Sequence, residues 1–412
     1  MLGCNVGLIF LLLSIFSISR LHGVQALQRG QEEGEYYDIS LSRTDSAYEN
    51  ECLRILDNEK VCKRSPKFFD LKNVISSSIA LQADYTSRMW ATYYGGIRMG
   101  PSGNQLFKVL FDTGSSEFWL PGDSCISQQC KTRQRYHKTS SWKPMLKEDG
   151  NSVPISIKYL SGEIKAVDGT TTVRLSDSIV LENVNVGLAT NINVPVMSQV
   201  HWDGIVGLGF RTKEMEYRGA KTFLESLMDN KSLYPNFRNQ VAYYVSKEGG
   251  NISFGGINPK FKKSQDAEFF WAPIEDGSTY WSLNLVDMHL KNSKKRNRFN
   301  TSSFALSNGQ ESRPIYKGTF GDLKVIMDTG SYLMYAPQSM SSLVDELRVE
   351  SCDEVGSKPT LVFTFKSSNG TKFPVELKPQ DYILSYQGSD GNKKCTLGIV
   401  VDDQQEVSLG IL

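Results

Sequence analysis

The sequence has no marked excess of charge of either sign, because its 412 residues hold 46 lysines and arginines against 45 aspartates and glutamates. A nucleic-acid-binding protein normally concentrates basic residues on one face, so this balance argues against a nucleic-acid partner. The chain also has no apolar run of about 20 residues, the length that a membrane-spanning helix needs. Its longest candidate, residues 6–18, falls short of that length. We therefore expect no stable membrane span.

Several catalytic motifs are also missing. Histidine is rare, with four residues in the chain, and neither G-x-S-x-G nor H-E-x-x-H occurs. No glycine-rich phosphate loop follows a predicted strand, and no C-x-x-C pair occurs. These absences argue against a serine hydrolase, a zinc protease, a nucleotide-binding enzyme and a thiolate metal site. We expect neither a cofactor nor a metal.

Residues 1–26 have the pattern of a signal peptide. The apolar run 6–18 is followed by Val24-Gln25-Ala26, which has the spacing that signal peptidase recognises. No Lys or Arg precedes the run, which is unusual and leaves an uncleaved anchor as the alternative. Six of the seven cysteines follow this segment, and pairing of neighbours would close the shortest loops among many possible pairings. Those neighbours are Cys52 and Cys62, Cys125 and Cys130, and Cys352 and Cys395.

The segment after the signal changes its charge along its length. Residues 27–51 are acidic and show no apolar periodicity, which predicts a poorly ordered tail. Residues 60–72 are basic. Such a basic segment could act as a removable plug for an acidic cleft, or it could be a solvated linker.

From about residue 81 the sequence consists of short β-rich runs bounded by Gly, Asp and Asn, which predicts a largely antiparallel β protein. The clearest runs are residues 90–97, 105–112, 154–159, 241–246, 251–255, 323–328 and 360–365. Helical periodicity is confined to residues 221–230 and 338–348, and both segments are expected to cover the core.

One motif occurs twice. Val-Leu-Phe-Asp112-Thr-Gly-Ser recurs far downstream as Val-Ile-Met-Asp328-Thr-Gly-Ser. A given tripeptide arises by chance about once in 8,000 positions, and here both copies follow three apolar residues of a predicted strand. A lone Asp-Thr-Gly is usually a turn that ends a strand. The matched pair instead indicates two equivalent lobes, each presenting one carboxylate from a strand-to-turn junction.

Two carboxylates held close together cannot both ionise, so one keeps its proton while the other is a base. A water molecule between Asp112 and Asp328 could then attack an amide by general acid–base catalysis, with no covalent intermediate. The neighbouring residues have supporting roles. We expect turn glycines that aim backbone N–H groups at the carboxylates, threonines that hydrogen-bond across the junction, and serines that donate to the carboxylates. These residues are Gly114 and Gly330, Thr113 and Thr329, and Ser115 and Ser331.

From residue 81 onward these features resemble the pepsin family of aspartic proteases. Asp112 to Pro121, which includes Trp119, is similar to the family motif D-T-G-S-S-x-x-W-x-P. Tyr159-Leu160-Ser161-Gly162 lies where the family has its flap, so the resemblance implies that Tyr159 hydrogen-bonds toward Trp119 and closes over the substrate. Residues 202–209 resemble the segment that completes the first active-site loop. The resemblance also implies the pairings Cys125–Cys130 and Cys352–Cys395.

The resemblance implies a mainly β, bilobal protein with two pseudo-symmetric lobes and a cleft between them. Residues 27–80 would be a prosegment and intramolecular inhibitor, 81–265 the first lobe and 266–412 the second. The function implied is that of a monomeric aspartic endopeptidase that cleaves extended polypeptides in the secretory pathway, outside the cell or in a lysosome-like organelle. Residues 291–312 are expected to form an exposed loop insertion. This insertion and Leu397-Gly-Ile-Val resemble the parasite plasmepsin-type branch of the family, in particular members that mature other secreted proteins.

Two departures from the family pattern bear on these expectations. Leu160 replaces a small flap residue, which would change the cleft beneath the flap. Residues 406–412 resemble the start of the last apolar strand of the family, so the second lobe is expected to lack its final strands. The alternative function is that of an inactive or truncated pepsin-like module that binds peptides.

Overall fold

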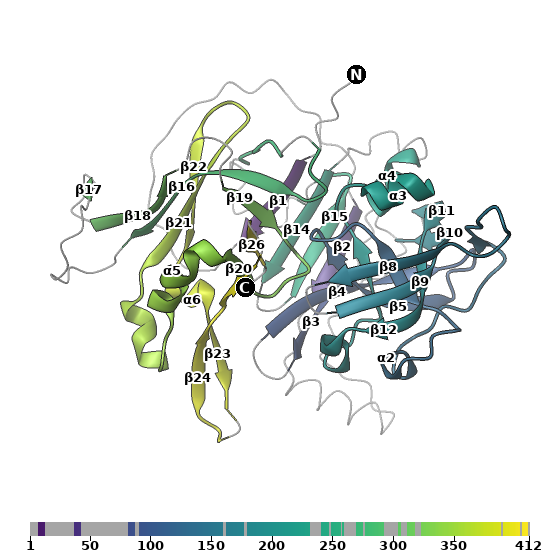
Figure 1. The fold of residues 1–412 in the computed structure, drawn as a ribbon, viewed down its shortest axis with the longest axis horizontal. Helices are drawn as coiled ribbons and strands as arrows, with labels where there is room; N and C mark the ends of the chain where they lie inside the picture. The colour runs from purple at the N-terminus through teal and green to yellow at the C-terminus, as the bar shows by residue number, and fades with distance from the viewer. Residues whose placement is uncertain are drawn as a thin grey trace.

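The computed structural model describes residues 7–12, 37–42, 81–86, 90–159, 162–176, 179–230, 240–246, 249–256, 258, 269–274, 277–291, 304–305, 311–317, 323–388, 390–403 and 406–410. These residues form a mainly β protein of two lobes, as predicted, with a small sheet between the lobes (Figure 1). The Cys52–Cys62 pair, flap residues 160–161 and most of the expected prosegment 27–80 lie outside the described residues.

The first lobe is a curled eleven-stranded sheet. Its strands are β3 (Leu81–Thr86), β4 (Trp90–Met99), β5 (Gln105–Asp112), β6 (Phe118–Pro121), β7 (Lys143–Pro144), β8 (Pro154–Tyr159), β9 (Gly162–Val167), β10 (Gly169–Arg174), β11 (Val180–Asn185), β12 (Gly187–Asn193) and β13 (Gly204–Gly207). Its helices are α2 (Gln128–Lys131), the 3-10 helix η1 (Pro195–Ser198), α3 (Lys213–Arg218) and α4 (Phe223–Asp229). The predicted helix at 221–230 is therefore α4, and Thr222 with Glu225 forms a capping box at its start.

The second lobe contains a nine-stranded sheet and a separate hairpin. The sheet consists of β16 (Ser282–Lys291), β17 (Phe304–Ala305), β18 (Glu311–Lys317), β19 (Lys324–Met327), β20 (Met334–Pro337), β21 (Thr360–Lys366), β22 (Lys372–Leu377), β25 (Ile399–Asp402) and β26 (Val407–Leu409), and the hairpin of β23 (Ile383–Gln387) and β24 (Lys393–Leu397). Its helical segments are η4 (Gln338–Met340), α5 (Ser341–Leu347), η5 (Cys352–Ser357) and α6 (Pro379–Tyr382). The predicted helix at 338–348 corresponds to η4 followed by α5.

A four-stranded sheet lies between the lobes (Figure 1), in the order β1 (Gly7–Leu12), β14 (Gln240–Ser246), β15 (Gly249–Phe254) and β2 (Tyr37–Ser42). Strand β2 corrects the prediction of an unstructured tail over residues 27–51, because residues 37–42 pair antiparallel with β15. The edge of β15 offers unpaired backbone N–H and C=O groups, and residues 37–42 (YDISLS) alternate apolar and polar residues, which is the pattern of a strand. Strand β1, within the predicted signal peptide, pairs parallel with β14.

The two lobes repeat one arrangement of four strands. In the first lobe β5 pairs parallel with β13, β13 pairs antiparallel with β6, and β6 pairs parallel with β12. In the second lobe β19 pairs parallel with β26, β26 pairs antiparallel with β20, and β20 pairs parallel with β25. The order β5-β13-β6-β12 therefore recurs as β19-β26-β20-β25. The twofold sequence motif thus belongs to a twofold structural repeat.

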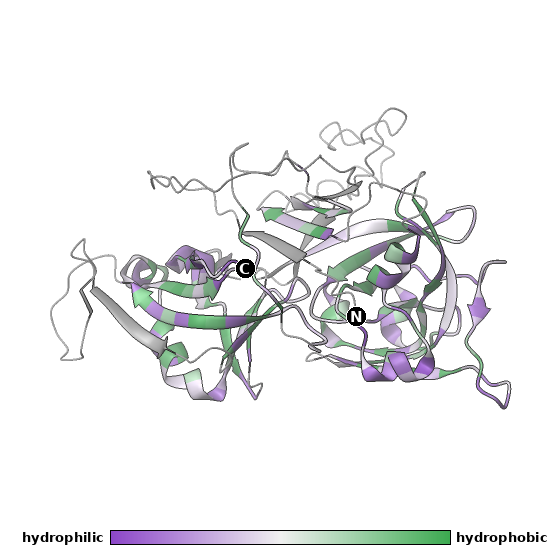
Figure 2. Cartoon of the chain, turned by 90° about the horizontal axis from the view of Figure 1, so that it is seen from above, coloured by the Kyte–Doolittle hydropathy of each residue, from purple (hydrophilic) through white to green (hydrophobic). Residues whose placement is uncertain are grey.

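The larger hydrophobic core connects the two lobes through the central sheet. It includes Phe111 of β5, Phe254 of β15 and Val325 of β19, and the rings of Phe111 and Phe254 are 6.1 Å apart. Trp281, fully buried at the start of the second lobe, donates its indole N–H to the carbonyl of Leu208 at 2.8 Å. In Figure 2 the strands of both lobes alternate hydrophilic and hydrophobic residues. The lobes are therefore joined by packed apolar side chains as well as by the chain itself.

Two disulfide bonds lie in the described part of the chain, Cys125–Cys130 and Cys352–Cys395. Both are the pairings implied by the family resemblance. The first closes a loop at α2, and the second ties η5 to the β23–β24 hairpin. Among the helices that the structure describes, none has the length and apolar character needed to cross a membrane.

The two disulfides should differ in their contribution to stability. Their sequence separations are 5 and 43 residues, and the chain-entropy account gives about 2 kcal/mol for the short loop and about 4 kcal/mol for the long one. Replacing both cysteines of a pair by Ala should therefore lower the free energy of unfolding by about twice as much for Cys352–Cys395. Denaturant unfolding of the two double variants measures this, and equal losses would contradict it.

Candidate active site

Asp112 and Asp328 occupy equivalent positions in the two lobes. Asp112 is the last residue of β5, and Asp328 directly follows β19. The parallel neighbours β13 and β26 hold these strand ends in place. Leu208 N–H donates to the carbonyl of Asp112 at 2.6 Å, and Asp328 N–H donates to the carbonyl of Leu409 at 3.0 Å. Residues 202–209 thus complete the first active-site loop as the resemblance implied, and 407–410 do the same in the second lobe.

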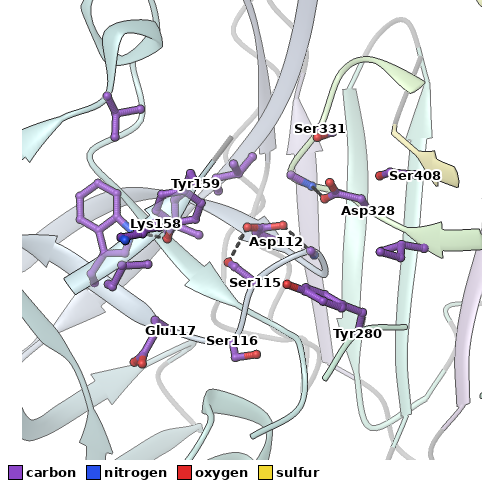
Figure 3. Close-up of a pocket in the computed structure, with 18 of the residues that line it drawn as sticks. Asp112, Ser115, Ser116, Glu117, Lys158, Tyr159, Tyr280, Asp328, Ser331 and Ser408 are labelled. Carbon is purple, nitrogen blue, oxygen red and sulfur yellow. Dashed lines mark hydrogen bonds between the residues drawn. The ribbon is translucent and has the colours of Figure 1, made fainter. Parts of the chain in front are cut away.

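The two carboxyl groups meet between the lobes (Figure 3), where the side chains of Asp112 and Asp328 are hydrogen-bonding partners. Each carboxyl group also packs against the turn glycine of the opposite lobe. A Cβ added to Gly114 would overlap the carboxylate of Asp328, and one added to Gly330 would overlap that of Asp112. Glycine is therefore required at both positions for a steric reason.

Reciprocal threonine hydrogen bonds join the two loops. Thr113 N–H donates to Thr329 Oγ1 at 3.0 Å, and Thr329 N–H donates to Thr113 Oγ1 at 2.8 Å. Each hydroxyl also donates to a carbonyl of the other lobe, Thr113 to Met327 at 2.7 Å and Thr329 to Phe111 at 2.6 Å. Both threonines are buried. Four buried bonds therefore fix the position of one Asp loop relative to the other.

The groups around the two carboxylates follow the sequence prediction with one exception. Gly114 N–H donates to Asp112 Oδ1, and Gly330 N–H donates to Asp328 Oδ1, both at 2.8 Å. Ser115 Oγ donates to Asp112 Oδ2 at 2.5 Å. The exception is Ser331, whose hydroxyl makes no hydrogen bond to Asp328 among the described residues, so that Asp328 is bonded here by the Gly330 N–H.

Burial is the main reason why the pKa of Asp112 is raised well above its ordinary value, and the charge of Asp328 raises it further. The hydrogen bonds from Ser115 and Gly114 act in the opposite direction. Because the two carboxyl groups are in contact, their protons belong to the pair. The arrangement therefore favours a state with one proton shared between Asp112 and Asp328.

The hairpin β8–β9 covers the site from the first lobe. Tyr159 at its tip accepts a hydrogen bond from Trp119 Nε1 at 2.8 Å, the contact implied by the family resemblance. Burial together with the charge of Asp112 raises the pKa of Tyr159. Gly162 has a φ of 147°, and a Cβ there would overlap the backbone carbonyl of Asn193. Only glycine fits this position beside the flap tip.

A cavity of about 1240 Å³ runs past both aspartates. Sequence analysis missed most of its lining, because these residues meet only after folding and, apart from Glu117 within the Asp112–Pro121 motif, belong to no motif. Figure 3 shows Tyr280 beneath Asp112 and Ser408 beside Asp328. The cavity residues not predicted from the sequence include Glu117, Lys158, Thr279, Tyr280, Tyr332, Tyr335, Glu406 and Ser408.

Two β lobes that each present an Asp-Thr-Gly turn to a shared cleft define an aspartic protease of the pepsin type. The family described as eukaryotic aspartyl protease matches residues 92–412, and this chain belongs to that family of aspartic-type endopeptidases.

Known relatives agree with this assignment. The chain is 34% identical over 337 residues to plasmepsin VII of Plasmodium falciparum (isolate NF54), which covers 78% of this chain and 73% of that protein. It is 30% identical over 382 residues to plasmepsin VII of Plasmodium berghei (strain Anka), covering 89% and 79%. Human gastricsin is 28% identical over 322 residues, covering 76% and 72%.

Replacing Thr113 by Val should destabilise the protein by about 2–4 kcal/mol, because it removes two buried hydrogen bonds and leaves their partners unsatisfied. Thr329→Val should have a similar effect because the contacts are reciprocal. Thr132→Val is a matched control, since the Thr132 hydroxyl makes one long, exposed bond to Gln129 and its loss should cost no more than about 0.5 kcal/mol. Denaturant unfolding measures all three, and equal losses at Thr113 and Thr132 would contradict the account.

The raised pKa of Asp112 predicts a pH-dependent stability difference. A carboxyl group with a raised folded-state pKa contributes stability below its unfolded pKa, and this contribution is lost as pH rises through the folded pKa. The melting temperature of Asp112→Asn minus that of the wild type should therefore increase as the pH rises above about 4. Thermal melts from acidic to neutral pH measure this difference. A constant or falling difference would show that Asp112 is not held in its protonated form by burial.

Proposed function

We propose that this endopeptidase hydrolyses peptide bonds of extended polypeptides with Asp112 and Asp328 acting on one water molecule. The observation that supports this most strongly is the contact of the two carboxyl groups across the lobes, held by the reciprocal bonds of Thr113 and Thr329. A carboxylate and a carboxylic acid side by side can accept one proton and donate another in a single step.

In the proposed reaction the ionised member of the pair removes a proton from water. The water oxygen forms a bond to the carbonyl carbon of the substrate, while the protonated member gives its proton to the carbonyl oxygen. The resulting tetrahedral diol then collapses. One diol hydroxyl returns its proton to the ionised carboxylate while the protonated carboxyl group gives its proton to the amide nitrogen, so that the C–N bond breaks and the products are a carboxylic acid and an amine. The pair ends with one proton, as it began.

The proposed substrate is an extended polypeptide that lies in the cavity between the lobes. Such a chain can be held by main-chain hydrogen bonds while its side chains enter successive pockets. One wall of the cavity is apolar, and includes Leu110, Ile157, Val194 and Ile205. The flap residue Tyr159 and its partner Trp119 lie on this side, so closure of β8–β9 would exclude water from the scissile bond.

We also propose that the chain works in the secretory pathway or an organelle supplied by it. The two disulfides are typical of an oxidising compartment, and residues 1–26 carry the signal pattern. The basic segment 60–72 is proposed to shield the acidic pair until residues 27–80 are removed. Its positive charge would be attracted to a cleft that contains Asp112, Asp328, Glu117 and Glu406.

The activity test uses a library of unstructured peptides, assayed with the full chain before and after incubation at acidic pH to allow prosegment removal. Asp112→Asn and Asp328→Asn should each lower kcat by about 1,000-fold or more, because each removes one half of the acid–base pair. The wild-type rate should show a bell-shaped pH dependence, since it needs one ionised and one protonated carboxyl group.

Asp229→Asn is the control, because Asp229 forms an exposed ion pair with Lys221 and should leave the rate unchanged. Equal hydrolysis by the wild type and Asp112→Asn would contradict the proposed mechanism. A folded, prosegment-free wild type that binds the peptides without cleaving them would instead identify an inert peptide-binding module.

A further inference from the structure

A buried arginine, Arg218, is bonded to Glu117, one of the residues that line the cavity. Arg218 is the last residue of α3, which ends there because Gly219 adopts a left-handed φ of 69°. All three nitrogens of its guanidinium are used. Nε donates to the carbonyl of Glu214 at 3.2 Å, Nη1 donates to the carboxylate of Asp168, and Nη2 donates to that of Glu117. The Arg218 side chain is 10% exposed and that of Asp168 is 2% exposed.

The carboxylates of Glu117 and Asp168, which bind Arg218, belong to different segments of the first lobe. Glu117 lies on the loop between β5 and β6, two residues after Ser115, and its carbonyl accepts a hydrogen bond from Gly207 N–H at 3.0 Å. Asp168 directly follows β9, at the base of the flap hairpin, where its N–H donates to the carbonyl of Val153 at 2.9 Å. Arg218 therefore connects the catalytic loop with the base of the flap.

The hairpin β8–β9 and residues 117–119 are connected a second time, at the tip of the hairpin. At the flap tip, Trp119 donates to the Tyr159 hydroxyl, and Trp119 is only two residues beyond Glu117. The hairpin is thus attached to residues 117–119 at both of its ends, by an ion pair at the base and by a hydrogen bond at the tip. In Figure 3 the Glu117 carboxylate lies away from Asp112. It can therefore bind Arg218 at the base of the hairpin without contacting the aspartate pair.

The charges make Arg218 difficult to replace. Two carboxylates of low exposure face one guanidinium, with Glu117 19% exposed. Burial raises the pKa of both Glu117 and Asp168, while Arg218 opposes the increase. Glu214 on α3 adds further negative charge near Glu117. Without Arg218 the carboxylates would repel each other and separate the loop from the hairpin, most strongly where both are ionised.

We propose that Arg218 is a positioning residue for peptide hydrolysis: by binding Glu117 and Asp168 together, it sets the distance between the flap hairpin and the catalytic loop. Arg218 acts through these two residues and touches neither the substrate nor the reacting atoms. The proposal rests on the function proposed above for Asp112 and Asp328, because the flap matters only if the site beneath it performs the reaction.

Hydrogen exchange of the full chain tests the proposal without requiring activity. In Arg218→Gln, backbone amides of residues 154–167 and 112–119 should exchange about tenfold faster or more, while those of 323–337 in the second lobe keep their wild-type rates. The difference from wild type should shrink at acidic pH, where one of the two carboxylates is protonated. Where activity is present, kcat/KM should fall by about 10- to 100-fold, since small misplacements of a site group have effects of that size.

Arg211→Gln is the matched control, because Arg211 pairs with Glu225 at the surface, and its exchange pattern should equal that of the wild type. Glu117→Gln serves as the second variant if Arg218→Gln does not fold, and it should show the same localised exchange in weaker form. Unchanged exchange in the hairpin, or a uniform increase through both lobes, would overturn the proposal. Faster exchange confined to the hairpin and the catalytic loop, in a protein whose wild type cleaves no peptide, would contradict the proposed function. It would still support the role of Arg218 in holding these two segments together.

Discussion

The structure depends on one constraint, which is that two carboxyl groups from different lobes must be held in contact in a buried place. Such groups repel each other when both are ionised, so the surrounding structure has to hold them together. Thr113 and Thr329 do this with backbone and hydroxyl bonds that cross between the lobes. The glycines at 114 and 330 leave room for the opposite carboxyl group. The shared proton follows from this geometry.

The strand repeat explains how the contact is built. In each lobe an aspartate stands at the end of a strand, and a parallel neighbour fixes that end through a backbone hydrogen bond. The two lobes then share a core that passes through Phe111, Phe254 and Trp281. The symmetry is incomplete around the carboxylates. Ser115 donates to Asp112, whereas Ser331 makes no such bond to Asp328 among the described residues, so the environments of the two acids are not equivalent.

Sequence analysis could predict those parts of the structure that depend on a short, continuous pattern of residues. The repeated Asp-Thr-Gly after apolar strands located both aspartates, and β-rich runs with turn residues gave the fold class and strands such as 105–112 and 154–159 to the residue. It failed where partners come together only through folding. Nothing near Arg218, Glu117 or Asp168 marks them as a cluster, and Tyr280 belongs to no motif. Strand β2 was missed although Tyr37, Ile39 and Leu41 alternate with polar residues, because this short run lies within a strongly acidic segment.

The central claim is that Asp112 and Asp328 titrate as one unit. A difference potentiometric titration tests it most directly, with the wild type compared with the Asp112→Asn/Asp328→Asn double variant, so that only the protons of the pair remain in the difference. The account predicts two separate steps, one proton released in the acidic range and the second held to a pH well above the ordinary carboxyl range. Release of both protons in a single step near the pKa of an isolated aspartate would contradict it.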